Sequence, residues 1–565
     1  MLKPIYRSCL TSLPTTITRR AISTTAMTQT TLATTLQGDS KPAYSRSTGL
    51  DPFTYTSGHW LKNDKLQREA RHIEFDFAAL CKKAIQACPG ANRIARQEKK
   101  EGTYNRAFLL HMDNGATVVA RVPFRVAGPR RLTTNSEVAT MAYIRAHTSV
   151  PVPRVIDWND DPANPTGTEY IIMEHASGAQ LHEKWNMMNT LQQMLCVKSA
   201  ATVVKEMAKL QFPAYGSLYF ADAPINPSLK LDLSNGFCIG PHCATQYWCL
   251  EPGESRYYDR RKPNQGPWTD ALSYCSGLID TGFSRIPSTD PAGGTSSSRI
   301  TQDHLHLLEV SEQVVKEVIK SPVIQNVSAP MLLHPDFHKR NIFVSNDDPT
   351  RLTAVIDWQS AGVEPVFSFA NETPDMVADR TIDMPLFEDE PDTSPNQTQS
   401  SHDKTREKEI SICEQTFEVA LKGWVPKLHD ARALDETLLR PIRYCHTSWR
   451  DGAAALRQEL IELSQRWNEL GLPNSCPYQP SPQELIRHAK EWEDFETFQS
   501  LKLFLVRSIN SNTDGWVPSA AWEAAKDANQ SVFEEWMQTA AQSEDPDVNE
   551  DRGRKLWPFD VNIDG

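Results

Sequence analysis

The chain has 565 residues, enough for roughly two to four domains of ordinary size. Hydrophobic residues make up 39 % and charged residues 23 %, which is typical of a globular protein and too apolar for a chain that is disordered throughout. The net charge of −12 argues against a protein that mainly binds nucleic acid. No apolar run reaches the ~18 residues that a transmembrane helix needs, so no transmembrane segment is expected.

Residues 1–38 have the composition of a mitochondrial presequence. They contain no Asp or Glu, and Lys3, Arg7, Arg19 and Arg20 lie among many Ser and Thr residues. Pro14 interrupts the apolar run that a secretory signal would need. The sequence after Arg20 is similar to a matrix-processing site, with cleavage near Ile22. We therefore expect import into mitochondria, with the matrix as destination; the alternative is a disordered basic tail.

The next part of the chain alternates between helical and strand patterns. Residues 39–63 are expected to be a linker, because they contain Pro42 and Pro52. The pair Asn114-Gly115 between two β-rich runs predicts a hairpin. Apolar periodicity and β-rich runs predict the other elements, namely helices over 64–87 and 136–147 and strands over 154–158 and 169–173. Together these elements form an expected N-terminal lobe over 64–178.

The remaining chain is expected to be mainly helical. Residues 179–385 are assigned to a C-terminal lobe, in which 212–298 has low periodicity. The segment 386–409 is rich in Asp, Ser, Thr and Lys, which predicts a disordered or solvated insertion. Residues 410–545 contain amphipathic helices, for example over 456–470 and 499–507, and 546–565 are expected to be a tail.

A group of cysteines lies in the irregular segment. Cys238, Cys243 and Cys249 lie near His242, but they lack the paired C-x-x-C spacing of a zinc site. Reduced, partly buried thiols are therefore the interpretation that we favour, and a structural zinc ion is the alternative. The scattered, odd number of cysteines fits a reducing compartment.

The stretch 331–365 contains the residues that indicate chemistry. His334-x-Asp336 is followed by Asn341, and two strand-like runs with a turn between them lead to Asp357. An antiparallel hairpin would bring Asn341 and Asp357 to the same end. Phosphoryl transfer needs one carboxylate to deprotonate an acceptor hydroxyl, and further oxygen ligands to hold Mg²⁺. Asp336, Asn341 and Asp357 supply that set.

The sequences HPDFHKRN and VIDW resemble the catalytic pattern of the aminoglycoside phosphotransferase and choline kinase-like family. This resemblance implies an α+β, bilobal protein-kinase-like fold, with a small β-rich N-lobe and a large, mainly helical C-lobe. It implies that Asp336 is the catalytic base and that His334 braces the catalytic loop. It also implies that Asn341 and Asp357 are ligands of Mg²⁺ and that ATP is the phosphate donor.

A second resemblance is narrower. The presequence and the sequences YTSGHWLKNDK, VARVPFRVAGPRRLTTNSEVATM and EYIIMEHASG are similar to the fungal mitochondrial family named for altered inheritance of mitochondria. This similarity covers most of the chain. It specifies neither an acceptor molecule nor a protein partner.

The family fold also implies nucleotide-binding residues in the N-lobe. Arg121 stands where the family normally has Lys, and Glu137 fits its acidic partner; the alternative is an ion pair without a nucleotide role. Gly102 and Asn105 lie in the loop expected to cover the phosphates, which has one glycine. The backbone at Glu174 and His175 would meet the adenine. Three further arginines, Arg125, Arg130 and Arg131, form a phosphate-binding patch or a solvated loop, and we favour the loop.

Two functions follow from these patterns. The first is a mitochondrial ATP-dependent phosphotransferase that transfers the γ-phosphate to a hydroxyl of an unidentified small molecule. The second is a catalytically weak or inactive kinase-like scaffold in mitochondrial maintenance or inheritance. The first function is our leading hypothesis, because the set of Asp336, Asn341 and Asp357 is complete. The second is the alternative, suggested by Arg121 in place of Lys and by the single glycine of the phosphate loop. Nucleic-acid binding conflicts with the acidic net charge.

Overall fold

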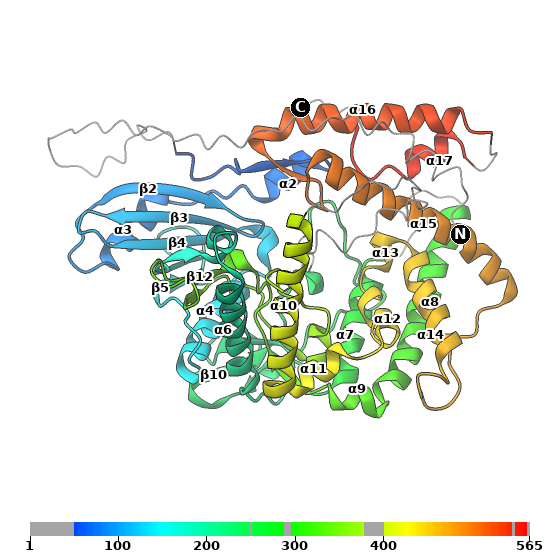
Figure 1. The fold of residues 1–565 in the computed structure, drawn as a ribbon, viewed down its shortest axis with the longest axis horizontal. Coiled ribbons are helices and arrows are strands. Elements are labelled where there is room, and N and C mark those ends of the chain that lie inside the picture. Colours follow the sequence, from blue (N-terminus) through cyan, green and yellow to red (C-terminus); the bar gives the residue numbers. More distant parts are fainter. Residues whose placement is uncertain (1–49, 249–250, 288–294, 378–400, 545–547, 562–565) are drawn as a thin grey trace. The chain divides into compact units, whose positions relative to one another are not determined.

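The computed structural model describes residues 50–248, 251–287, 295–377, 401–544 and 548–561 (Figure 1). The chain forms two compact units, one over Ala70–Phe495 and one made of the two terminal segments, up to Glu69 and from Glu496. The expected presequence over 1–38, and 386–400 of the expected insertion, lie outside the described residues.

The small lobe of the larger unit is a five-stranded antiparallel sheet with helix α4 packed against it (Figure 1). Along strand β3 (Asn105–Met112), buried and half-buried side chains alternate, and Phe108 and Leu110 are fully buried. The predicted hairpin around Asn114-Gly115 is confirmed, with Leu109 opposite Val119. In sheet order the strands are β2 (Ile94–Glu101), β3 (Asn105–Met112), β4 (Thr117–Pro123), β6 (Tyr170–Glu174) and β5 (Val155–Asn159), and the helices of this lobe are α3 (Phe77–Gln86) and α4 (Leu132–His147).

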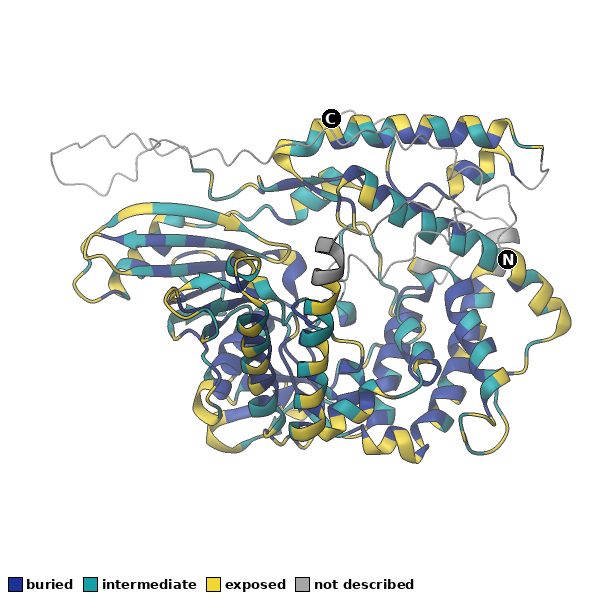
Figure 2. Cartoon of the chain, in the orientation of Figure 1, coloured by how far each residue is buried: buried dark blue, intermediate teal, exposed yellow. Residues whose placement is uncertain are grey.

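The large lobe is mainly helical, and its buried residues form one continuous core (Figure 2). The α+β, two-lobed, protein-kinase-like fold is therefore confirmed. Its helices are α5 (Leu181–Trp185), α6 (Thr190–Ala208), α7 (Ala271–Ser284), α8 (Thr295–Ile319), α9 (Pro322–Asn326), α10 (Ser401–Trp424), α11 (Pro426–Arg432), α12 (Arg440–Tyr444), α13 (Ser448–Asp451), α14 (Ala453–Arg466) and the first part of α15 (Pro482–Ile509).

Among its described residues, the larger unit contains three small sheets. In the first, β8 (Ser217–Phe220), β10 (Phe237–Gly240) and β9 (Leu231–Asp232) are antiparallel neighbours. In the second, β11 (Pro330–Leu332) pairs with β14 (Val363–Pro365). The third contains β13 (Leu352–Val355), β12 (Ile342–Val344) and β7 (Ala179–Gln180), so the segment that leaves the small lobe pairs with the hairpin that follows the catalytic motif.

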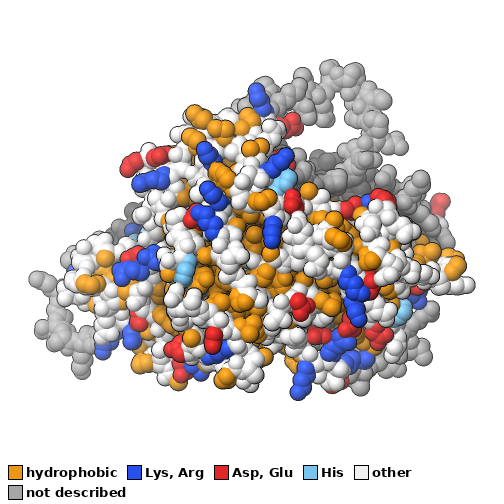
Figure 3. Space-filling view, turned by 90° about the horizontal axis from the view of Figure 1, so that it is seen from below, with side chains coloured by type: hydrophobic (Ala, Val, Ile, Leu, Met, Phe, Trp, Pro, Cys, Tyr) orange, Lys and Arg blue, Asp and Glu red, His pale blue; other side chains and the backbone are white. Residues whose placement is uncertain are grey.

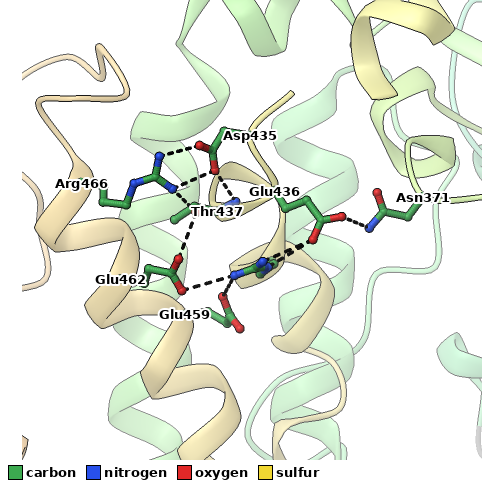
Figure 4. A network of polar contacts seen from close by, with 8 residues as sticks. Asn371, Asp435, Glu436, Thr437, Glu459, Glu462 and Arg466 are labelled. Atoms are coloured by element: carbon green, nitrogen blue, oxygen red, sulfur yellow. Dashed lines mark hydrogen bonds and ion pairs between the residues drawn. The ribbon is translucent and has the colours of Figure 1, made fainter. Parts of the chain in front are cut away.

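A polar network fixes the helices near the end of the large lobe (Figure 4). The Arg466 guanidinium donates to Asp435, with Nη2 at 2.6 Å from Oδ2, and lowers the pKa of that carboxyl to about 2. Arg440 Nη1 lies 3.3 Å from Glu462 Oε2, and its guanidinium also contacts Glu436. Arg440 is the first residue of α12 and Glu462 lies on α14, so their contact joins these two helices. Glu436 lies in the turn that precedes α12.

The second unit joins the two ends of the described chain. Strand β1 (Gly58–Trp60) pairs with β15 (Trp516–Pro518), and Trp60 Nε1 donates to Asp514 Oδ2 at 2.9 Å. The linker expected over 39–63 therefore contains a strand, and the last part of 410–545 belongs to this unit. Local sequence patterns carry no information on a partner about 450 residues away, which explains both differences. The unit contains the last part of α15 and, among the described residues, the helices α2 (Asp64–Ala70), α16 (Trp522–Ala541) and α17 (Glu550–Lys555).

Three sequence predictions were wrong in detail. The single helix over 64–87 is two helices, because Asp76 caps α3 by accepting the Ala79 N–H at 2.8 Å. Residues 401–409, expected in a disordered insertion, belong to α10, whose Phe417 and Leu421 are buried against the core. The irregular segment 212–298 contains the 14-residue helix α7.

Other expectations from composition can be compared with the structure. Among the described helices, none is long and apolar enough to cross a membrane. Figure 3 shows basic and acidic side chains interspersed on the face seen from below. Cys238 and Cys243 are buried thiols, and Cys249 lies outside the described residues.

The turn that leaves the small lobe depends on a glycine. Gly178 has φ +98°, and a Cβ there would overlap the Val344 carbonyl of β12. Gly115 also has a positive φ, +85°, but a Cβ there meets nothing within 4 Å. Gly178→Ala therefore combines backbone strain with a steric clash, whereas Gly115→Ala has the strain alone, about 1–2 kcal/mol.

We expect Gly178→Ala to lower the Tm further than Gly115→Ala, measured by circular dichroism. The added destabilisation should be about 1–3 kcal/mol. Equal losses of Tm for the two variants would show that the β7–β12 contact does not require the glycine.

Candidate active site

The loop between β11 and β12 is fixed by His334. Its Nε2 donates to the Ile356 carbonyl at 2.8 Å, and its Nδ1 accepts the Asp336 N–H at 3.1 Å. Burial lowers the pKa of His334, which keeps the ring neutral with one nitrogen as donor and the other as acceptor. The ring thus links the start of the loop to the end of β13, as expected for a bracing residue.

Asp336 and Asn341 are held together. Asn341 Nδ2 donates to the Asp336 carbonyl at 2.9 Å and to its Oδ2 at 2.7 Å. The Ile356 N–H donates to the Asn341 carbonyl at 2.9 Å, and Ile342 lies opposite Val355 in the β12–β13 hairpin. The prediction that the hairpin brings Asn341 next to the segment of Asp357 is confirmed.

Asp357 connects this hairpin with the sheet of the small lobe. It has φ 68°, a left-handed conformation that Asp tolerates better than most residues. Its Oδ1 accepts a hydrogen bond from Arg121 Nη1 at 3.0 Å, and its side chain is 42 % exposed. Arg121 lies on β4, and its Nη2 forms an ion pair with Glu137 of α4. The expected pair of Arg121 and Glu137 is therefore present.

Glu137 is a buried acid in this group. Its side chain is 3 % exposed, and burial raises its pKa from 4.5 to about 7, although the Arg121 guanidinium opposes the increase. The charge of Asp357 raises the pKa further. The group therefore contains two carboxyls that share one arginine.

Gln359 is a site residue that the sequence analysis missed. Its Oε1 accepts hydrogen bonds from Asn105 Nδ2 and, at 3.3 Å, from Arg121 Nη2. Its Nε2 donates to the Ala127 carbonyl at 3.0 Å. Gln359 follows Asp357 by two residues, so its place directly after the I-D-W motif was the available signal. Through Gln359, Asn105 is therefore connected to the cluster formed by Arg121, Glu137 and Asp357.

The other expected nucleotide-binding residues lie at the edges of this group. Gly102 lies in the β2–β3 turn, where its N–H donates to the Asn105 carbonyl at 2.9 Å. Glu174 ends β6 and forms an exposed ion pair with Arg154 at 2.8 Å. His175 lies 6.4 Å from the ring of Phe343 on β12, and burial lowers its pKa. In the described part of the chain, no hydrogen bond joins Glu174 or His175 to Asp336 or Asp357.

Polar groups also surround the Asp336 carboxylate. His338 Nε2 lies 3.3 Å from Oδ1, and Arg340 Nε lies 3.5 Å from Oδ2. Asp375, which the sequence analysis did not single out, accepts the Lys339 N–H at 2.8 Å. Asp336 is still 37 % exposed, so a substrate hydroxyl can reach it.

The donor atoms near Asp336 fit Mg²⁺. Over the described residues, Asn341 Oδ1 and Asp357 Oδ2 receive no hydrogen bond, and both are oxygen donors of the kind that Mg²⁺ prefers. No group of three or more His, Cys, Asp or Glu side chains among the described residues could hold a metal ion. A Mg²⁺ ion that binds phosphates needs only one or two protein ligands, so the oxygens of Asn341 and Asp357 would be sufficient.

The chain is similar to known proteins in sequence and in structure. Residues 97–236 and 293–368 match the family model of the phosphotransferase enzyme family, and these ranges include β3, β4, α4 and the loop between β11 and β12. Over these residues the chain is similar to this family. A structural comparison matches 74 % of the chain to 98 % of an ADP-bound aminoglycoside phosphotransferase of type 2″-Ib, at 13 % identity and a TM-score of 0.34.

Two fungal relatives match about four fifths of the chain. A subtelomeric hrmA-associated cluster protein of Aspergillus fumigatus is 25 % identical over 503 residues, 80 % of this chain and 94 % of the relative. The mitochondrial altered inheritance of mitochondria protein 9 of Yarrowia lipolytica is 24 % identical over 512 residues, 83 % of this chain and 85 % of the relative. The chain is thus similar over most of its length to an altered-inheritance-of-mitochondria protein, which confirms the second resemblance.

The raised pKa of Glu137 predicts a pH dependence of stability. A folded-state pKa above the unfolded one gives stability that is fully present below 4.5 and is lost as the pH rises through about 7. The Tm of the wild type relative to Glu137→Gln should therefore fall between about pH 5 and about pH 8, by the equivalent of up to about 3 kcal/mol.

The exposed residue Glu183 provides a control, since Glu183→Gln also removes one negative charge. Its Tm difference from the wild type should stay nearly constant over the same range. A Tm difference between wild type and Glu137→Gln that is constant or grows with pH would contradict the burial-raised pKa.

Proposed function

We propose that this protein is an ATP- and Mg²⁺-dependent phosphotransferase that acts on a hydroxyl group of a small molecule. The observation that carries the proposal is the convergence of Asp336, Asn341 and Asp357, held together by the β12–β13 hairpin and by the hydrogen bonds of Asn341 to Asp336. The match of residues 97–236 and 293–368 to the phosphotransferase enzyme family supports it.

Each residue has a distinct task in the proposed reaction. Asp336 orients the acceptor hydroxyl and takes its proton on the carboxylate, while Asn341 holds that carboxylate in place. Asn341 Oδ1 and Asp357 are the proposed ligands of Mg²⁺, which when bound offsets the negative charge of the phosphates. Arg121, aligned by Glu137, contacts the phosphates of ATP.

The proposed location is the mitochondrion, and specifically the matrix. The relative from Yarrowia lipolytica is named as mitochondrial. Residues 1–38 of this chain contain basic residues but no Asp or Glu, which is the composition of a cleaved presequence. An acceptor would then be a matrix metabolite with a free hydroxyl.

Asp336→Asn tests the proposal directly. Because the amide cannot take the hydroxyl proton, phosphorylation of a matrix metabolite extract by Mg-ATP should fall by roughly 10²-fold or more. Asp347→Asn in the β12–β13 turn makes the same chemical change at an exposed position and should leave the rate unchanged. Phosphorylated products are measured by mass spectrometry. If no product of the wild type depends on Asp336, the enzymatic proposal is wrong.

A second candidate function is a kinase-like scaffold without phosphotransfer. The observation that favours it is that Arg121 contacts both Glu137 and Asp357, so that the guanidinium engages one of the two proposed metal ligands. Arg is bulkier than the Lys of the family pattern and is not equivalent to it.

Variants of Arg121 separate the two functions. For a phosphotransferase, Arg121→Met should weaken Mg-ATP binding by roughly tenfold or more, because a charge-assisted phosphate contact is lost. Arg121→Lys keeps the charge and should bind more tightly than Arg121→Met. Binding is measured by calorimetry. A wild type without Mg-dependent ATP binding would leave the scaffold as the supported function.

A further inference from the structure

A cavity of about 460 Å³ lies in the small lobe, apart from the candidate active site. Three chain segments line it, over 72–74, 123–133 and 167–169. None of Asp336, Asn341 and Asp357 is among the lining residues. Its volume falls in the range of sites for small molecules, about 300–1,000 Å³.

Two arginines give this cavity its charge. Arg125 and Arg130 both line it, and in the described part of the chain neither side chain forms a hydrogen bond or an ion pair. Neighbouring Arg131, by contrast, lies 3.7 Å from Asp160. The planar guanidinium matches the oxygens of a phosphate group, and two such groups around one cavity favour a phosphate-bearing ligand.

The acidic residues of the cavity compensate this charge only in part, through the electrostatic interaction of Arg130 with Glu169. Glu169 accepts the Arg131 N–H and the Thr134 hydroxyl, both at 2.8 Å, and burial raises its pKa. Both of its oxygens are therefore engaged within the wall. Glu74 is 90 % exposed and lies 3.7 Å from His72. The groups that remain for a ligand are the two guanidinium groups.

The wall that carries both arginines has a fixed conformation. Gly128 has φ +146°, and a Cβ there would overlap Thr133 Oγ1 and lie 3.2 Å from the Cys243 carbonyl. The Ala127 carbonyl accepts the hydrogen bond from Gln359, which also contacts Arg121. The loop that carries Arg125 and Arg130 therefore lines the cavity and also contacts Gln359 of the candidate active site.

We propose that this cavity binds a small molecule that carries a phosphate group, held by Arg125 and Arg130. The site is separate from the proposed nucleotide site, so it does not depend on the proposed phosphotransfer. The cavity has room for more than a bare anion, and we therefore expect a phosphate monoester to bind more tightly than inorganic phosphate.

Thermal-shift titrations of the full chain without nucleotide test this proposal. The probes are glycerol 3-phosphate and inorganic phosphate, with glycerol as the uncharged comparison. Glycerol 3-phosphate should raise the Tm to a plateau, and the double variant Arg125→Gln/Arg130→Gln should require a roughly tenfold higher concentration or show no shift. The exposed pair Arg93→Gln/Arg96→Gln loses the same charge at the start of β2 and should respond as the wild type does.

The comparison of the two probes identifies the phosphate source. A lower half-saturating concentration for glycerol 3-phosphate supports a phosphorylated small molecule. An equal effect of inorganic phosphate, also lost in the double variant, supports the same site with the free anion as its ligand. No saturable shift with either probe, or a shift that persists in the double variant, would overturn the proposal.

Discussion

The pairing of β12 with β13 is the constraint on which the candidate site depends. Asn341 immediately precedes β12, and Asp357 follows β13 by two residues, so only the antiparallel register brings them to one end. The hydrogen bond from Ile356 N–H to the Asn341 carbonyl closes that end. His334 donates to the carbonyl of the same Ile356, which fixes the catalytic loop to the hairpin. Side chains that can take a proton and hold a metal ion thus share one main-chain scaffold.

Arg121 connects this scaffold to the small lobe. Its guanidinium contacts Glu137 of α4, Asp357 and Gln359, so one cation joins β4, α4 and the segment after β13. Burying the charged groups of Arg121 and Glu137 is costly unless they compensate each other, and the raised pKa of Glu137 indicates that the compensation is incomplete. A cation that took over the charge of Asp357 would release Arg121 toward an anion. This coupling gives a physical reason for binding metal and phosphate together.

Local patterns were sufficient for part of the fold and the site. The hairpin at Asn114-Gly115, the helix α4 and the hairpin before Asp357 follow from turn residues and from apolar periodicity, which act within a few residues. Strand β2 was missed because its sequence IARQEKKE is polar on both faces, as is common for a strand at the edge of a sheet.

Contacts between distant segments could not be predicted in this way. The β1–β15 pairing joins Gly58 to Pro518, and Gln359 contacts Asn105 across 254 positions. No local periodicity encodes either contact, because each depends on how the whole chain folds. The residues found by motif therefore lie at the centre of the site, whereas Gln359 and Asp375 complete it.

A structure with bound Mg²⁺ and a non-hydrolysable ATP analogue tests the central claim most directly. We expect the metal at about 2.1 Å from Asn341 Oδ1 and from a carboxylate oxygen of Asp357. Arg121 should then contact a phosphate oxygen and keep its ion pair with Glu137. A nucleotide bound elsewhere, or a metal that contacts neither Asn341 nor Asp357, would contradict the phosphotransferase site.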